Sequence, residues 1–142
     1  TKKEILPWKG FCHVHDRITA DHVRRARDLH PGSIVIVHPE CRPEVIDRAD
    51  HVASTSGIIR LVCELPDQEF IIGTEIGILH RLKKECPAKN CYPLSSGAIC
   101  TNMKKTDLTK VRQALVDLQP RITVPDDIAQ RARRAIERML AV

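Results

Sequence analysis

The chain has 142 residues, of which 42% are hydrophobic and 29% are charged, and this length supports one hydrophobic core. Its formal net charge of +5 favours anionic ligands, but an aromatic content of 3% argues against nucleic-acid binding by base stacking. No apolar run reaches the 18 residues that a membrane-spanning helix requires. We therefore expect neither nucleic-acid nor membrane partners, whereas phosphate and carboxylate ligands fit the charge.

Six cysteines could form three disulfides, but no signal peptide is recognisable. Cys63, Cys86 and Cys91 lie in ordinary helix-like or loop-like contexts, which favours reduced thiols in the cytoplasm. Cys63 reads as a core residue and Cys41 as a packing residue. Cys86 and Cys91 are either incidental or a redox-sensitive pair.

The chain begins at Thr1, and no element precedes its first apolar segment, residues 5–8. We therefore expect that an N-terminal portion is missing. A helix is predicted over residues 19–29, capped by Thr19 and ended by Pro31-Gly32, with Val23, Ala26 and Leu29 on one face.

Strand-like and helix-like segments then alternate. We expect strands at 33–37, 51–53, 69–72 and 91–94, a short helix from 42, a turn at 54–57, and helices at 58–65 and 75–84, the last with Ile78, Leu79 and Leu82 facing inward. After a loop at 95–101, amphipathic helices are predicted at about 107–118 and 125–140. This alternation predicts a three-layer α/β/α fold with a short parallel sheet, followed by a C-terminal helical segment.

Polar clusters follow three of the predicted strands: residues 38–40, 54–56 and 74–75. Ligands of parallel sheets collect beyond the carboxyl ends of the strands, so these clusters are expected to share one rim. His38 and Glu40 offer paired acid and base groups, and the hydroxyls of Ser54 and Thr55 suit oxyanions. The alternatives are a helix cap for Ser54 or Thr55 and a solvent-exposed position for Glu40.

Cys12, His15, His38, Glu40 and Cys100 place soft and acid/base ligands at three separated points of the chain, which suggests one assembled metal site. The alternative is that the cysteines are small core residues and the histidines have ordinary structural roles. A closed structural zinc site usually has Cys-x-x-Cys pairs, and none occurs here.

Five motifs occur in order along nearly the whole chain. They are residues 8–15 (Trp-Lys-Gly-Phe-Cys-His-Val-His), 38–41 (His-Pro-Glu-Cys), 54–57 (Ser-Thr-Ser-Gly), 73–82 (Gly-Thr-Glu-Ile-Gly-Ile-Leu-His-Arg-Leu) and 100–104 (Cys-Thr-Asn-Met-Lys). With these motifs and intervals the chain resembles the C-terminal half of the quinolinate synthase family. That family's N-terminal half is absent here.

The resemblance implies an iron–sulfur enzyme of NAD biosynthesis that condenses iminoaspartate with dihydroxyacetone phosphate to quinolinate. It implies a [4Fe–4S] cluster held by Cys12, Cys100 and a third cysteine in the missing half. His15, His38 and Glu40 would be catalytic and substrate-binding, and Ser54 and Thr55 substrate-binding. Glu75, His80 and Arg81 lie in a family motif. His80 and Arg81 are expected to act as scaffold or as charges at the rim and not in the chemistry, and Glu75 is intermediate between these roles. The alternative function is a noncatalytic α/β module that binds metal or anions and lacks a stable cluster.

The expected organisation has three parts. Residues 1–15 form the end of a preceding domain and the first cluster-ligand loop, and residues 16–94 form the α/β/α domain. Residues 95–142 form the second cluster-ligand loop and C-terminal helices that pack on the missing N-terminal part. The oligomeric state is not predicted.

Overall fold

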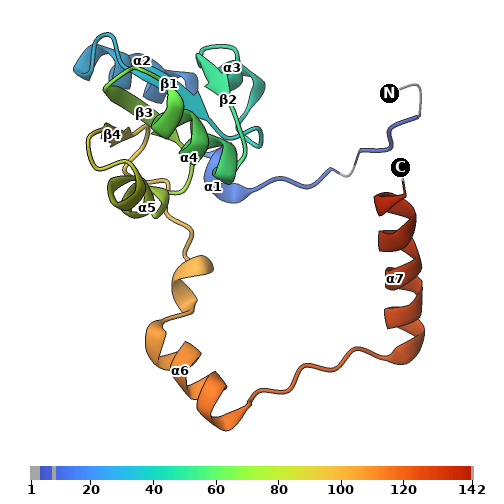
Figure 1. Cartoon of the computed structure of the whole chain (residues 1–142). Coiled ribbons are helices and arrows are strands. Elements are labelled where there is room, and N and C mark those ends of the chain that lie inside the picture. The colour runs from blue at the N-terminus through green and yellow to red at the C-terminus, as the bar shows by residue number, and fades with distance from the viewer. Residues whose placement is uncertain (1–3, 8, 142) are drawn as a thin grey trace. The chain divides into compact units, whose positions relative to one another are not determined.

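The computed structural model describes residues 4–7 and 9–141, so Trp8 of the first motif lies outside the described residues. The chain divides into two units, Thr1–Thr101 and Asn102–Val142 (Figure 1). The first unit holds all the strands found among the described residues.

Four strands form one parallel sheet in the order β2-β1-β3-β4. They are β1 (Ile34–Val37), β2 (His51–Val52), β3 (Glu69–Gly73) and β4 (Asn90–Pro93). The central strand β1 is a run of β-branched apolar residues, and β3 is apolar after Glu69. Both are buried except at their first positions, as expected for strands covered on both faces. The predicted parallel sheet is confirmed.

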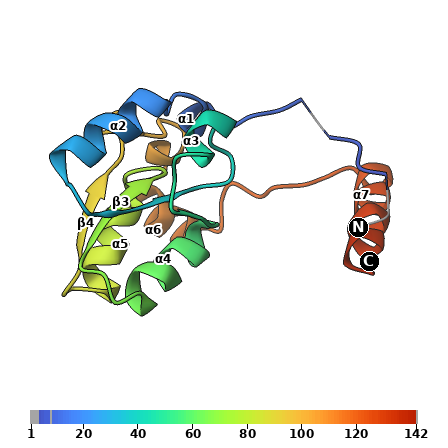
Figure 2. The same cartoon turned by 90° about the horizontal axis from the view of Figure 1, so that it is seen from above.

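Helices cover both faces of this sheet (Figure 2). On one face lie α1 (His13–Asp16), α2 (Ala20–Leu29) and α3 (Pro43–Ile46), and on the other lie α4 (Thr55–Glu64) and α5 (Ile78–Glu85). Because successive strand side chains point to opposite faces, Val35, Val37 and Ile71 join the first core cluster and Ile36, Phe70 and Ile72 join the second. The three-layer prediction is therefore confirmed.

Helix α2 begins where the sequence predicts. Thr19 and His22 form a capping box in which the Thr19 backbone N–H donates to His22 Nδ1 at 3.0 Å. Val23 and Ala26 are buried as expected, but Leu29 is 75% exposed, so the predicted apolar face is wrong at its last position. The core cluster includes Val23 and Ala26 but not Leu29, which lies at the end of the helix just before the chain turns at Gly32, where φ is +84°.

Helix α4 begins earlier than predicted. The sequence predicts a turn over residues 54–57, whereas the helix starts at Thr55 with Ser54 as its N-cap. Ser54 Oγ accepts the Gly57 N–H at 3.4 Å, so the alternative interpretation of Ser54 as a cap is confirmed. In the first turn, a Cβ on Gly57 would lie 2.9 Å from the Ala53 Cβ, so glycine permits this close approach.

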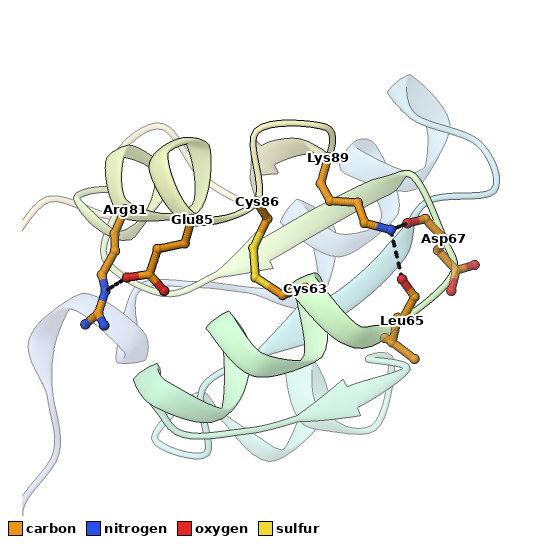
Figure 3. Close-up of a disulfide and its surroundings, with 7 residues drawn as sticks. All are labelled: Cys63, Leu65, Asp67, Arg81, Glu85, Cys86 and Lys89. Carbon is orange, nitrogen blue, oxygen red and sulfur yellow. Dashed lines mark hydrogen bonds and ion pairs between the residues drawn. A yellow bond between two sulfur atoms is a disulfide. The ribbon is translucent and has the colours of Figure 1, made fainter.

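A disulfide joins Cys63 of α4 to Cys86, the C-cap residue of α5 (Figure 3). The prediction of reduced thiols is wrong for this pair, as is the alternative pairing of Cys86 with Cys91, which is a free thiol. Cys63 is also exposed and not a core residue. The physical reason is tertiary: α4 and α5 pack on the same face of the sheet, which brings two Cα atoms 23 residues apart in sequence to 5.5 Å.

The second unit contains a short 3-10 helix η1 (Met103–Lys105) and the helices α6 (Leu108–Asp117) and α7 (Asp126–Leu140). Both predicted C-terminal helices are confirmed. Asp107 caps α6 by accepting the Lys110 N–H at 2.8 Å. Large apolar side chains of α6 and α7 are exposed, among them Leu108, Leu115, Ile136 and Met139. Within the described part of the chain, no helix combines the length and hydropathy needed to cross a membrane.

Candidate active site

The order in which successive strands are added to the sheet reverses between β1 and β3, which is the topological switch point. The connection from β1 leads to β2 on one side, and the next connection crosses back over β1 to reach β3. Ligands of open parallel sheets bind at such a switch point, beyond the carboxyl ends of the strands. His38 follows β1 and Thr74 follows β3, and the His38 N–H donates to the Gly73 carbonyl at 3.0 Å.

Four polar side chains meet at this switch point. His15, on α1, forms a 2.8 Å hydrogen bond between its Nε2 and Thr74 Oγ1, and its ring stacks on His38 with centroids 4.4 Å apart. Glu40 Oε2 lies 3.2 Å from His15 Nδ1 and 3.5 Å from His38 Nδ1. The structure thus brings together all three residues that the resemblance assigns to catalysis.

The surroundings of His15 favour a neutral imidazole. Its pKa is lowered, first by burial and then by the neighbouring His38, while Glu40 opposes the shift. Its Nδ1 is buried and makes no aligned hydrogen bond among the described residues, although the Glu40 carboxylate lies close. A carboxylate only accepts, so the proton of neutral His15 is favoured on Nδ1, and Nε2 then accepts from the Thr74 hydroxyl.

His38 takes the opposite tautomer. The Glu40 backbone N–H donates to His38 Nδ1 at 3.3 Å, so this nitrogen is an acceptor and the proton of the neutral ring sits on Nε2. Glu40 itself is about half exposed, with 54% of its side chain accessible. Its carboxylate can therefore reach both histidines and a ligand from solvent.

Helix α1 is tied to the start of α3 by an ion pair. Arg42 donates through two nitrogens to the two Asp16 carboxylate oxygens, at 2.9 and 3.1 Å. Such a fork fixes orientation as well as distance. It therefore sets the relative position of His15, on α1, and Glu40, two residues before Arg42.

The two predicted cluster ligands lie in the same unit. Cys12 precedes α1, Cys100 lies in the loop after β4, and both are partly buried against the core cluster of the first face. The Cys12 thiol, the His15 ring and the Glu40 carboxylate have ligand atoms within 4.8 Å of one another, and Cys100 is not part of that group of described residues.

Glu75 holds the Cys100 loop. Its Oε1 accepts the Cys100 N–H at 3.3 Å and its Oε2 accepts the Gly77 N–H at 2.7 Å. The Ile76 N–H also donates to the Ala98 carbonyl at 3.0 Å. The end of β3 and the Cys100 loop are thus joined by side-chain and backbone bonds.

Two free thiols on one core cluster fit an iron–sulfur cluster by donor chemistry, because thiolates are the ligands that such clusters select. Neither thiol is committed to a disulfide. Two cysteines are one short of the set of three that the family resemblance implies. Cys12 and Cys100 would therefore supply two of the three thiolates that the resemblance implies.

Ser54 and Thr55 lie at the carboxyl end of β2, on the same rim as His38 and Thr74. Ser54 caps α4 by accepting the Gly57 N–H, and the helix begins at Thr55. Contacts described for these residues do not link them to His38 or Glu40. Their position suits an anion, because a helix N-terminus carries partial positive charge.

Cys41 is confirmed as a packing residue. It is 5% exposed within the first core cluster, and its Sγ contacts the Gly73 carbonyl at 3.6 Å. Burial raises the pKa of this thiol to about 11, so it stays protonated at neutral pH.

Sequence reasoning missed two contacts of the site. Thr74 belongs to a predicted rim cluster, but its hydrogen bond to His15 joins residues 59 positions apart, and no local sequence pattern indicates it. The Asp16 to Arg42 fork was not predicted either. Asp16 and Arg42 are 26 positions apart in the sequence, and helical or strand periodicity does not relate residues at that separation.

Comparison with known proteins adds an independent observation. The sequence matches the NadA family, described as quinolinate synthetase A protein, over residues 1–141. The chain belongs to this family. Relatives named quinolinate synthase include those of Methanoregula boonei, 72% identical over 142 residues, and Desulforudis audaxviator, 54% identical over 142 residues.

A third relative from Thermodesulfovibrio yellowstonii is 50% identical over 141 residues. The match covers 100% of this chain and 47% of the length of the first two relatives. The chain therefore spans about half the length of the curated relatives it matches. The family predicted from the five motifs is confirmed.

Proposed function

We propose that this chain contributes to a quinolinate synthase, an enzyme of NAD biosynthesis that condenses iminoaspartate with dihydroxyacetone phosphate, with loss of phosphate and water. The carrying observation is the group of His15, His38, Glu40 and Thr74 at the sheet's switch point. Family membership supports the proposal, since the relatives are named quinolinate synthase.

Glu40 is proposed as the group that moves protons. Its carboxylate is accessible and lies within 3.5 Å of a nitrogen of each histidine, so it can take a proton from substrate and exchange it with an imidazole. His15 remains neutral and is held by Thr74. His38 presents an Nε2–H donor to a substrate oxygen, because its Nδ1 is already an acceptor.

Ser54 and Thr55 are proposed to bind a carboxylate or phosphate of the substrates. Both dihydroxyacetone phosphate and iminoaspartate are anionic, and hydroxyls with helix N-terminal N–H groups are suitable donors. The formal charge of +5 is consistent with such ligands.

Cys12 and Cys100 are proposed as ligands of a [4Fe–4S] cluster. When bound, the cluster supplies a Lewis-acidic iron that lacks a protein ligand and can polarise a hydroxyl or carboxylate. The third cysteine and the remaining pocket are expected in the part of the enzyme that this chain does not include. The C-terminal helices α6 and α7, with their exposed apolar side chains, are proposed to pack on that part. The cytoplasmic location predicted from the sequence stays a prediction.

A noncatalytic metal-binding module is the second candidate. The observation in its favour is the compact donor group of Cys12, His15 and Glu40, which could hold a single ion. A thiolate, an imidazole and a carboxylate are all ligands of zinc. This candidate requires no contribution from Cys100.

Anaerobic reconstitution with iron and sulfide separates the two candidates. The test protein is a chimera in which this chain replaces the matching segment of the Methanoregula boonei enzyme, which is 72% identical over that segment. We expect Cys12→Ala and Cys100→Ala each to abolish the visible iron–sulfur absorbance, while Cys41→Ala and Cys63→Ala retain it.

Iron and sulfide content per chain is the deciding measurement. Retention of the cluster in Cys100→Ala, together with its loss in Cys41→Ala, would show that the ligand assignment is wrong. Zinc binding that survives Cys100→Ala, with no iron–sulfur absorbance in any variant, would favour the module.

A further inference from the structure

We propose that Glu75 is a positioning residue that holds the Cys100 thiol in the geometry for metal ligation. The inference deepens the proposed function and rests on it. Glu75 directly follows Thr74, so the end of β3 carries two adjacent side chains that reach different parts of the site. Thr74 binds His15 and Glu75 binds the Cys100 loop.

Both oxygens of the Glu75 carboxylate are engaged by backbone donors. Oε1 accepts the Cys100 N–H at 3.3 Å and Oε2 accepts the Gly77 N–H at 2.7 Å. Hydrogen bonds to an ionised acceptor are roughly twice as strong as neutral ones. A group whose two oxygens already accept N–H donors is better suited to hold a loop than to take a proton.

The Gly77 contact also belongs to helix α5. Gly77 is its N-cap residue and has no side chain to cap the helix, so the Glu75 carboxylate supplies the acceptor and a negative charge at the positive end of the helix. Helix α5 packs Ile78 and Leu82 in the second core cluster. Glu75 therefore couples the Cys100 loop to a helix that is fixed in the core.

A backbone bond reinforces this coupling. The Ile76 N–H donates to the Ala98 carbonyl at 3.0 Å, and Ala98 is only 4% exposed. Ala98 is thus held by the core and Cys100 by Glu75. The segment that presents the thiol has its backbone fixed on both sides of Ile99.

Replacement of Glu75 with Gln is the sharpest test. Gln keeps the shape but offers one acceptor oxygen and a donor NH₂, so it cannot accept from both N–H groups. Glu85→Gln is the matched control, because the same chemical change falls on an exposed carboxylate of α5 that pairs with Arg81. Amide hydrogen exchange is measured on the metal-free 142-residue chain.

We expect Glu75→Gln to speed exchange at the Cys100 or Gly77 amide by about tenfold or more, the range for one hydrogen bond to a charged group. Iodoacetamide labelling of Cys100, mapped by mass spectrometry, should rise with it, whereas labelling of Cys12 should not change. Glu85→Gln should leave all of these rates unchanged. Exchange and labelling that are the same in Glu75→Gln and the wild type would overturn the proposal.

The second readout is cluster retention in the chimera with the Methanoregula boonei enzyme. Glu75→Gln should shorten the half-life of the iron–sulfur absorbance under air, and Glu85→Gln should not. A faster-exchanging Cys100 loop with an unchanged cluster half-life would contradict a role in ligation. Failure of the wild-type chimera to bind iron would instead refute the proposed function, and the exchange rates would still decide whether Glu75 anchors the loop.

Discussion

Glu40 and the two histidines show how side chains with ordinary properties acquire different roles from their neighbours. His15 is buried, which lowers its pKa, and its ring is held between Thr74 and Glu40. His38 lies at the same switch point but uses Nδ1 to accept a backbone N–H. The Glu40 carboxylate therefore lies near two imidazoles with different preferred tautomers. His15 favours its proton on Nδ1, and His38 favours its proton on Nε2.

Replacement of Glu40 with Gln should lower turnover by about a hundredfold to ten-thousandfold, the usual cost of removing a general acid or base. The amide keeps the volume but cannot take a proton. Quinolinate formation by the reconstituted chimera measures the effect, and the iron–sulfur absorbance should be unchanged. Glu44→Gln, an exposed carboxylate in α3, is the control. Equal turnover in Glu40→Gln and Glu44→Gln would exclude a proton-transfer role for Glu40.

At the scale of elements, the close approach of β1, β3 and β4 positions the site. Gly73 ends β3, and its carbonyl accepts the His38 N–H. A Cβ at Gly73 would lie 2.7 Å from Val37 Cγ1 and 2.9 Å from Leu94 Cδ2. Glycine is required there because Val37 and Leu94 are both buried and have little room to move.

Gly73→Ala should therefore destabilise the first unit by about 1–3 kcal/mol, the usual cost of overpacking a core. Chemical denaturation of the 142-residue chain measures the change. Gly97→Ala is the matched control, since a Cβ there meets only Ser95 Oγ, at 3.7 Å. Equal free energies of unfolding for Gly73→Ala and Gly97→Ala would show that the side chains around Gly73 can move aside without loss of stability.

The Cys63 to Cys86 disulfide joins two helices on one face of the sheet. Nearby, Lys89 Nζ donates to the carbonyls of Leu65 and Asp67 at 2.8 and 2.6 Å, so the connections after α4 and α5 are held together at a second point (Figure 3). The disulfide closes a segment of 23 residues, and cross-linking a segment of this size restricts the unfolded chain.

Reduction of this disulfide should lower stability by about 3 kcal/mol on the chain-entropy account. Thermal unfolding of the isolated chain, with and without dithiothreitol, measures the loss, and Cys63→Ala should be insensitive to the reductant. Thiol titration in denaturant should find four free thiols before reduction and six after it, since Cys12, Cys41, Cys91 and Cys100 are free. Six thiols without a reductant would show that the pair does not form under those conditions.

At the scale of the whole molecule, the chain covers 47% of the length of its relatives from Methanoregula boonei and Desulforudis audaxviator. Its second unit consists of helices without buried residues, although both carry apolar side chains. An amphipathic helix gains most of its stability by packing its apolar face. The proposed function accounts for these exposed faces by assigning them to contacts with the rest of the enzyme.

The 142-residue chain by itself should form no quinolinate. Two cysteines complete only part of the proposed ligand set, so the pocket is expected to require the rest of the enzyme. The measurement is an anaerobic assay with iminoaspartate generated in place and dihydroxyacetone phosphate, with the chimera as positive control. Quinolinate from the isolated chain would show that the remainder is dispensable for activity.

Local patterns determined the family, the parallel sheet and most element boundaries. A short β-branched apolar run such as Ile34–Val37 is typical of a strand covered on both faces, and its alternation with helical segments indicates a parallel sheet. The five motifs and their order can be read directly from the sequence. The rim was predictable for the same reason: parallel strands place their carboxyl ends on one edge, so His38, Ser54 and Thr74 had to share it.

Contacts between distant segments were decided only by the tertiary structure. The bonds of Thr74 to His15 and Glu75 to Cys100, and the disulfide, join residues 59, 25 and 23 positions apart. Periodicity and capping act over a few residues and carry no information on such pairs. Packing of helices on the two faces of the sheet sets these distances, which is why the predicted free Cys63 and Cys86 proved to be bonded.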